Sequence, residues 1–185
     1  MFVKKTIPNL FTIANLCLGV FAILFVYNGH SEWATLLVIF AMLTDGLDGR
    51  LARALDAQSE FGKELDSLSD VISFGIAPAF IMYVVAFQHM GALGIVVTVL
   101  FPICGALRLA RFNVAEAPPG YFLGLPIPAA GGMLSLMALF HTEIFEWLML
   151  GFAVMLSYLM ISRIKYPNLK KIGISKRLIW FVCVF

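Results

Sequence analysis

The stretch "LTDGLDGRLARALDAQSEFGKELDSLSD", residues 43–70, concentrates negative charge in an otherwise apolar chain. It holds seven of the eleven acidic residues of the protein, namely Asp45, Asp48, Asp56, Glu60, Glu64, Asp66 and Asp70. The whole chain is 61% hydrophobic and 13% charged, whereas a soluble domain is typically about 45–50% apolar and about 25% charged. Because so little polar surface is left to face water, the composition predicts a protein whose solvent is the lipid bilayer.

Apolar runs of membrane-spanning length lie on both sides of this stretch and overlap it. A span needs about 20 apolar residues. The hydrophobic pattern predicts six spans: Asn9–Asn28, Glu32–Leu55, Leu65–Phe87, Ala92–Leu109, Ile127–His141 and Ile144–Ile161. The predicted fold class is therefore all-α, a polytopic integral membrane bundle of about six transmembrane helices. The fifth run is short, so we expect it to be tilted, or broken near Pro126 and Pro128.

The distribution of Lys and Arg predicts the orientation of the chain. If the N-terminus is cytoplasmic and each run crosses once, all thirteen basic residues fall on the cytoplasmic side. The three outer connections, near Gly29, Gln88 and Thr142, hold none. This asymmetry is the positive-inside pattern of membrane proteins. We therefore expect an integral cell membrane protein with residues 43–70 at its cytoplasmic face.

We expect a single domain over residues 1–185, because the linkers are short and no repeat is evident. A basic cytoplasmic segment, "IKYPNLKKIGISKR", residues 164–177, follows the last run. The apolar stretch "LIWFVCVF", residues 178–185, then ends the chain and is too short to span a bilayer. Either it lies in the membrane interface, or it begins a further span in a chain that continues past Phe185.

Two pairs of carboxylates each share one helix face. Asp45 and Asp48 are three residues apart, and Asp66 and Asp70 are four apart, which is the spacing of neighbours on a helix surface. If the helices that carry them pack as an antiparallel hairpin, four carboxylates meet in one cavity at membrane depth. An isolated charge there costs at least about 2.5–3.5 kcal/mol. We therefore expect a cation to hold the four carboxylates together.

Divalent metal ions fit this pattern best. Ligand sets made only of oxygen suit Mg²⁺ or Mn²⁺, and four carboxylates suit a two-metal site that polarises a phosphoryl group. Small residues lie beside the acids: Gly46 and Gly49 flank Asp48, Ala52 follows one turn later, and Gly62 lies in the loop. They would leave room for a nucleotide or phosphate against the backbone, and they would equally allow close helix packing.

The spacing of the acids and small residues resembles a known signature. The pattern Asp45-x2-Asp48-Gly49-x2-Ala52-Arg53-x8-Gly62-x3-Asp66-x3-Asp70 matches every fixed position of the CDP-alcohol phosphotransferase signature. The resemblance implies a reaction in which an alcohol attacks the β-phosphorus of a CDP-activated lipid and CMP leaves. It also implies a homodimer.

The same resemblance implies roles for individual residues. Asp45, Asp48 and Asp66 would ligate two divalent ions, and Asp70 would both ligate an ion and accept the proton of the attacking hydroxyl. The implied contacts to the CDP-lipid are Gly49, Ala52, Arg53, Ser59 and Gly62, together with Asn9 and Thr12 from "PNLFT" near the N-terminus. Asn9 or Thr12 would also fit a different role, as the cap of the first helix.

Three further stretches resemble the phosphatidylserine synthases, a branch of the same family: "ELDSLSDVISFGIAPA", "LRLARFN" and "GLPIPAA". The resemblance implies CDP-diacylglycerol and L-serine as substrates. A serine carboxylate needs a cationic partner, and Arg108 and Arg111 lie three apart with Asn113 nearby. Paired arginines would also suit a phosphorylated alcohol such as inositol phosphate or glycerol phosphate. Arginines at a helix end also fit simple membrane anchoring.

A cation or proton transporter is the alternative class, because transporters also place acids inside the membrane. Transporters usually distribute these acids over several helices and show inverted repeats. Here the acids belong to one predicted hairpin beside Gly and Arg, which favours the enzyme. The predicted partners are CDP-diacylglycerol, L-serine, membrane lipids and a second copy of the chain, with no nucleic acid.

Overall fold

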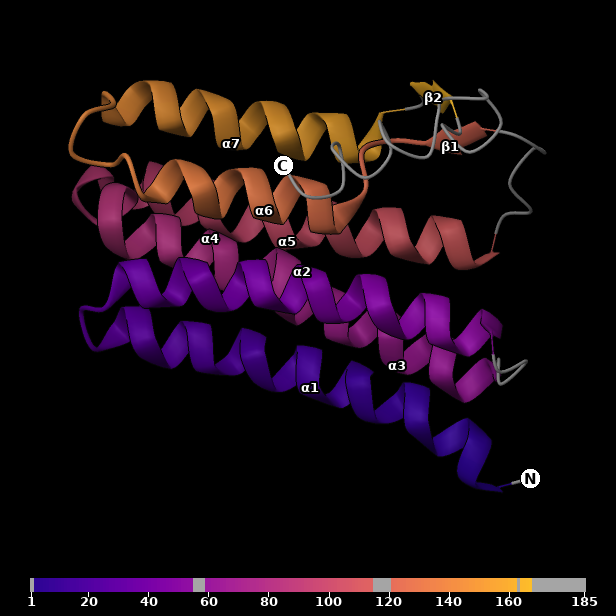
Figure 1. The fold of residues 1–185 in the computed structure, drawn as a ribbon. Coiled ribbons are helices and arrows are strands. Elements are labelled where there is room, and N and C mark those ends of the chain that lie inside the picture. The colour runs from indigo at the N-terminus through magenta and orange to yellow at the C-terminus, as the bar shows by residue number, and fades with distance from the viewer. Residues whose placement is uncertain (1, 55–58, 115–120, 163, 168–185) are drawn as a thin grey trace, which may run out of the picture.

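The computed structural model describes residues 2–54, 59–114, 121–162 and 164–167, with the side chains of residues 9–47, 59–114, 124–162 and 164. Its helices, in chain order, are α1 (Phe2–Tyr27), α2 (Ser31–Ala54), α3 (Glu60–Asp70), the π-helix η1 (Val71–Ile76), α4 (Ala77–Met82), the π-helix η2 (Tyr83–Phe87), the 3₁₀-helix η3 (Gln88–Met90), α5 (Gly91–Val114), α6 (Ile127–Ala138) and α7 (Glu146–Ile161). The segments α3, η1, α4 and η2 follow one another without a break and form one long rod. The rods lie side by side as a bundle (Figure 1), so the predicted helical fold is confirmed.

A short β-ribbon adds to the helices and was not predicted. Strand β1 (Tyr121–Leu123) pairs antiparallel with β2 (Lys165–Pro167), with Phe122 opposite Tyr166. The N–H of Gly124 also donates to the carbonyl of Ile164, and the N–H of Leu125 donates to the carbonyl of Leu159. These bonds tie the connection between α5 and α6 to the end of α7.

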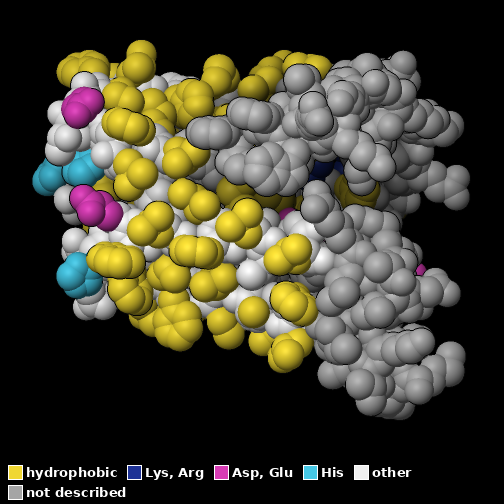
Figure 2. Space-filling view, viewed as in Figure 1, with side chains coloured by type: hydrophobic (Ala, Val, Ile, Leu, Met, Phe, Trp, Pro, Cys, Tyr) yellow, Lys and Arg dark blue, Asp and Glu magenta, His cyan; other side chains and the backbone are white. Residues whose placement is uncertain are grey.

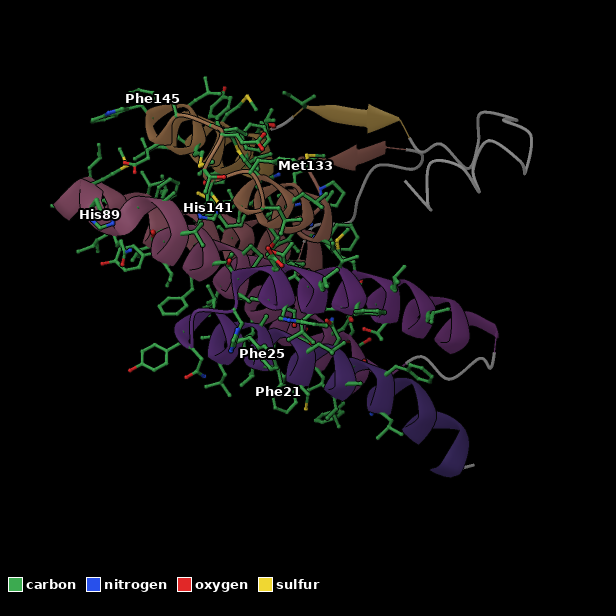
Figure 3. All side chains as sticks on the ribbon, turned by 60° about the vertical axis from the view of Figure 1, so that its left-hand side comes forward. Phe21, Phe25, His89, Met133, His141 and Phe145 are labelled. Carbon is green, nitrogen blue, oxygen red and sulfur yellow. The ribbon has the colours of Figure 1, made fainter. Side chains whose placement is uncertain are left out.

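Glycines with positive φ mark two of the chain reversals. Helix α1 ends in a Schellman motif: Gly29 has φ +84°, its N–H donates to Val26, and the N–H of His30 donates to Phe25. Gly91, with φ +58°, caps η3 and is the first residue of α5. The predicted outer connections lie together at one end of the bundle, where His89, His141 and Phe145 are labelled (Figure 3). The start of α1, the end of α2 and the start of α3 lie at the other end (Figure 1).

Hydrophobic side chains cover the outside of the bundle between its two ends. Large apolar side chains such as Phe21, Phe40 and Leu148 are more than half exposed, and Figure 2 shows a broad apolar surface, with the histidine side chains in view at one end. Soluble proteins rarely expose apolar patches of this extent. Among the described residues, two helical stretches are long and apolar enough to cross a membrane, Asn9–Tyr27 and Glu60–Val114. The count of six spans stays a prediction.

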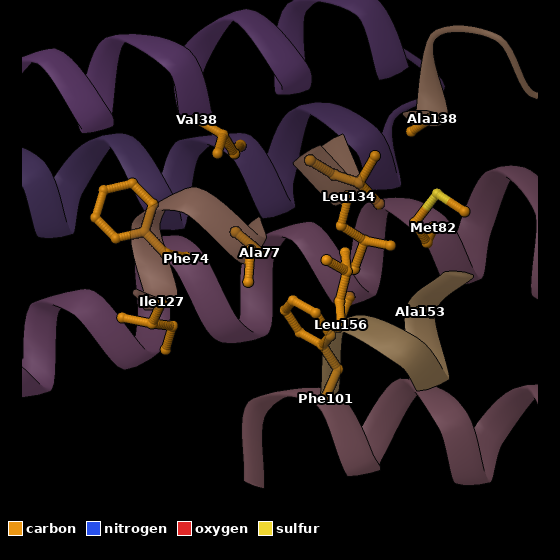
Figure 4. Packing of buried hydrophobic residues seen from close by; sticks show 14 of the residues in the cluster. Val38, Phe74, Ala77, Met82, Phe101, Ile127, Leu134, Ala138, Ala153 and Leu156 are labelled. Carbon is orange, nitrogen blue, oxygen red and sulfur yellow. The ribbon is translucent and has the colours of Figure 1, made fainter. Parts of the chain in front are cut away.

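The π-helix η1 lies at the centre of the packing. Phe74 of η1 is fully buried among apolar side chains of several helices, including Val38 and Ile127 (Figure 4). Small residues let the neighbouring helices approach its backbone. A Cβ atom added to Gly131 of α6 would collide with the carbonyl oxygen of Phe74, and one added to Gly19 of α1 would lie 2.7 Å from Cα of Ser73. The contact between Gly19 and Ser73 holds the long rod against α1.

The contact at Gly19 predicts a specific loss of stability. Gly19→Ala should destabilise the protein by about 1–3 kcal/mol, because the added methyl group meets the backbone of Ser73 and cannot be accommodated by a rotamer change. Thermal unfolding in detergent measures the effect. Gly151→Ala in α7 is the matched control, because a Cβ atom there meets nothing within 4 Å, and it should leave the melting temperature unchanged or raise it slightly. Equal melting temperatures for the two variants would contradict this packing.

Candidate functional site

Three of the four predicted metal ligands lie together. Asp45 of α2 and Asp66 and Asp70 of α3 each offer a carboxylate oxygen, and these oxygens lie within 4.8 Å of one another. The side chain of Asp70 is only 7% exposed, and the side chains of Asp45 and Asp70 are within hydrogen-bonding reach of each other. We call Asp45, Asp66 and Asp70 the acidic cluster. The predicted hairpin geometry therefore brings α2 and α3 together at these carboxylates.

The other residues of the signature on α2 are only partly described. Asp48, Gly49, Ala52 and Arg53 belong to the last turns of α2, but their side chains lie outside the described residues. Their predicted roles as metal ligand and CDP-lipid contacts stay predictions.

Two serines hold the acidic cluster against α1. The hydroxyl of Ser69 donates to the carbonyl of Thr12 at 2.9 Å, and the hydroxyl of Ser73 donates to the carbonyl of Asn15 at 2.9 Å. Both serines are fully buried, and they flank Asp70 in the chain. Neither serine was predicted from the sequence to belong to the site. Their spacing of four residues, which puts two hydroxyls on one face of an apolar helix, was the available signal.

Three of the predicted CDP-lipid contacts meet at the start of α3. Ser59 is the N-cap of α3, and its hydroxyl accepts the N–H of Gly62 at 3.0 Å. A Cβ atom on Gly62 would lie 3.0 Å from both Oδ1 of Asn9 and Oγ of Ser59. Glycine at this position therefore keeps the space between Asn9 and Ser59 open.

The alternative role of Asn9 and Thr12 as helix caps is wrong. Helix α1 begins at Phe2, so both residues lie inside the helix and neither is at its first turn. Thr12 is buried, with 4% of its surface exposed. On the same face of α1, Asn9 and Thr12 lie along α3, the helix that carries Asp66 and Asp70.

The two arginines of α5 have different surroundings. Arg108 is 8% exposed and interacts electrostatically with Asp70 and with Arg111; among the described residues its Nε has no hydrogen-bond partner. Arg111 donates to the carbonyls of Ile161 at 3.0 Å and Ser162 at 3.3 Å, which is the capping role of a basic residue at the C-terminal end of a helix, here α7. Arg108 is thus the arginine that faces the acidic cluster.

Asn113 lies beside the same region. Its amide donates to the hydroxyl of Ser67 at 3.0 Å, so it joins the end of α5 to the residue that follows Asp66. Arg108 and Asn113 of α5 therefore both face the helix that carries two of the acids, while Arg111 is directed to α7.

The chemistry of the cluster fits a divalent cation with oxygen ligands. Three carboxylate oxygens within 4.8 Å repel one another in water-poor surroundings unless a positive charge lies between them. One arginine cannot neutralise all three. Ligand sets made only of oxygen suit Mg²⁺ and Mn²⁺. The fold and this site together define a helical membrane protein with an acidic site of the metal-binding type.

Comparisons with known proteins agree with this class. The chain matches the CDP-alcohol phosphatidyltransferase family model over residues 5–159, and it belongs to that family. A CDP-diacylglycerol–serine O-phosphatidyltransferase of Helicobacter pylori strain J99 is 41% identical over 186 residues, which cover 96% of this chain and 78% of that protein.

Two other relatives extend the similarity to distant organisms. A protein of Bacillus subtilis strain 168 with the same name is 41% identical over 167 residues, covering 89% of this chain and 92% of the relative. An archaetidylserine synthase of Methanothermobacter thermautotrophicus is 40% identical over 173 residues, covering 91% of this chain and 72% of the relative.

The acidic cluster predicts stabilisation by metal. Mn²⁺ or Mg²⁺ should raise the melting temperature of the purified protein, because an ion that binds only the folded state adds about 2.7 kcal/mol at a concentration of 100 times its dissociation constant. Asp66→Asn should abolish most of this increase. Glu64→Gln, which removes an exposed acid from the same helix, should retain it. An Asp66→Asn protein that gains as much from Mn²⁺ as the wild type would rule out the cluster as the metal site.

Proposed function

We propose that the protein transfers a phosphatidyl group from CDP-diacylglycerol to the hydroxyl of L-serine, giving phosphatidylserine and CMP in phospholipid synthesis. The observation that carries the proposal is the acidic cluster, in which carboxylates of α2 and α3 converge within 4.8 Å, with Asp70 buried and Asp45 and Asp66 half-buried. Membership of the CDP-alcohol phosphatidyltransferase family supplies the reaction type. The names of the relatives supply the acceptor.

Asp45, Asp66 and Asp70, with Asp48 from the next turn of α2, would hold two divalent ions, either Mg²⁺ or Mn²⁺. The ions would stabilise negative charge on the diphosphate and on the departing CMP. The carboxylates would hold this positive charge near Arg108, which interacts electrostatically with Asp70. Residues from both α2 and α3 are needed, so the site exists only in the folded hairpin.

Asp70 would act as the general base. Its carboxylate accepts the proton of the serine hydroxyl as the oxygen attacks the β-phosphorus of CDP-diacylglycerol. A new bond forms between the serine oxygen and phosphorus, the bond between phosphorus and the bridging oxygen breaks, and CMP leaves with the bonding electrons. The burial of Asp70 supports this role, because a shielded carboxylate is less accessible to competing water.

The contacts of the arginines support serine over a phosphorylated alcohol. Arg108 would bind the serine carboxylate, since a guanidinium can hold a carboxylate with two parallel hydrogen bonds. Arg111 has donors committed to Ile161 and Ser162, so the region offers one arginine rather than a pair. A single guanidinium suits one carboxylate better than the doubly charged phosphate of inositol phosphate or glycerol phosphate. Asn113 would complete the polar wall beside Arg108.

The nucleotide would lie at the end of the bundle where α1 meets the start of α3. Asn9, Ser59 and Gly62 line that region in close contact; Thr12, Gly49, Ala52 and Arg53 would complete the CDP-lipid site. We further propose that this site opens to the cytoplasm, where serine and CMP are dissolved while both lipids stay in the leaflet. The chain would act as one domain and as a homodimer in the membrane.

The reaction is tested with purified protein, CDP-diacylglycerol and one acceptor at a time. CMP release should require serine together with Mn²⁺ or Mg²⁺. Release with inositol phosphate or glycerol phosphate but not with serine would favour the other acceptors within the same chemistry. Cation or proton flux in proteoliposomes without any CMP release would favour the transporter.

The role of Arg108 predicts a change in the kinetics of one substrate. Arg108→Gln should raise the KM for serine by about 10- to 100-fold, because a hydrogen bond to a charged group contributes about 1.5–3 kcal/mol. The KM for CDP-diacylglycerol should change little. Arg111→Gln should mainly lower the melting temperature, and it should raise the serine KM less than Arg108→Gln does. An unchanged serine KM in Arg108→Gln would reject this assignment.

A further inference from the structure

Helix α1 carries a buried amide whose hydrogen bonds are not provided by the described residues. Asn15 is 0% exposed, and neither its Oδ1 nor its Nδ2 has a hydrogen-bond partner among the side chains and backbone that the structure describes. A buried polar group left without a partner costs about 1–3 kcal/mol. An apolar residue of the same size would avoid this cost, so the amide calls for an explanation.

The register of the helices places Asn15 beside the acidic cluster. Helix α1 and the rod of α3 and η1 run in the same direction (Figure 1), and Gly19 packs directly against Ser73. Asn15 precedes Gly19 by one helical turn, and Ser69 and Asp70 precede Ser73 by about one turn. Asn15 therefore lies level with Ser69 and Asp70. The two serine hydrogen bonds, to the carbonyls of Thr12 and Asn15, hold this register.

The buried faces of α1 and α2 point into the same interior. Helix α1 buries one stripe of residues, namely Thr12, Asn15, Gly19, Ala22 and Val26. Helix α2 buries a stripe that contains Val38 and Ala41. Asp45 continues this stripe one turn further along α2. Asn15 and Asp45 therefore border the same space as Asp70, between α1, α2 and the long rod.

We propose that Asn15 is a positioning residue of the metal centre. Its Nδ2 donates a hydrogen bond, through one bound water, to a carboxylate of the acidic cluster and so orients that carboxylate toward the ion. Residues that hydrogen-bond to metal ligands commonly change metal affinity by 10- to 100-fold when they are replaced. The inference rests on the metal centre of the proposed function and is independent of the acceptor alcohol.

The test measures metal binding without substrates. Asn15→Leu removes the amide at similar volume, and Asn15→Ala is a second variant in case leucine does not fit. The concentration of Mn²⁺ that gives half of the maximal increase in melting temperature should rise about 10- to 100-fold in both variants.

Ser135→Ala is the matched control. Ser135 of α6 is also fully buried, and its hydroxyl lacks a partner among the described residues. Its carbonyl accepts a hydrogen bond from the hydroxyl of Thr35, in the half of the bundle away from the acidic cluster. This variant should keep the wild-type Mn²⁺ midpoint. The same rise in Ser135→Ala as in the Asn15 variants would show a general packing effect and overturn the proposal.

The other outcomes also decide the question. A wild-type Mn²⁺ midpoint in either folded Asn15 variant overturns the positioning role. Failure of Mn²⁺ and Mg²⁺ to stabilise the wild type overturns both this role and the metal centre. A shifted midpoint in a protein that releases no CMP with serine supports the role of Asn15 while rejecting the proposed function.

Discussion

Mutual repulsion between carboxylates is the constraint on which this structure depends. Two unit charges 4 Å apart interact by about 4 kcal/mol at an effective dielectric constant of 20, and the acidic cluster contains three carboxylates within a comparable distance. Helix packing must hold these groups together, and a cation must offset their charge. Arg108 supplies part of that charge next to Asp70. The negative charge that Arg108 leaves uncompensated is the physical reason for expecting metal ions at this point of the bundle.

The same helices that form the core also form the site. Asp70 is followed directly by the π-helix η1, and π-helical turns are frequent at functional sites. Gly19 and Gly131 allow α1 and α6 to contact the backbone of η1, while Ser69 and Ser73 donate to α1 on either side of Asp70. Since Asp70 leads directly into this closely packed part of the rod, its position does not depend on a loop.

Local spacing made much of the site predictable, and tertiary contacts explain what was missed. Asp66 and Asp70 share a face because helix geometry fixes residues four apart, and a hairpin brings Asp45 to them. The partners of Arg111 depend on where α7 ends in space, so the sequence could not separate its role from that of Arg108. The β-ribbon and the π-helices were missed because they arise from contacts with distant segments and leave no period in the sequence. Asn15 was missed because one amide in an apolar run has no pattern of its own.

The central claim is that carboxylates from two neighbouring helices converge on divalent metal. Crystals grown with Mn²⁺ and measured near the manganese absorption edge test it most directly, because anomalous scattering locates the ion without reference to activity. The account predicts an anomalous peak bounded by carboxylate oxygens of Asp45, Asp66 and Asp70. A map with Mn²⁺ bound elsewhere, or with these three side chains pointing into separate spaces, would contradict it.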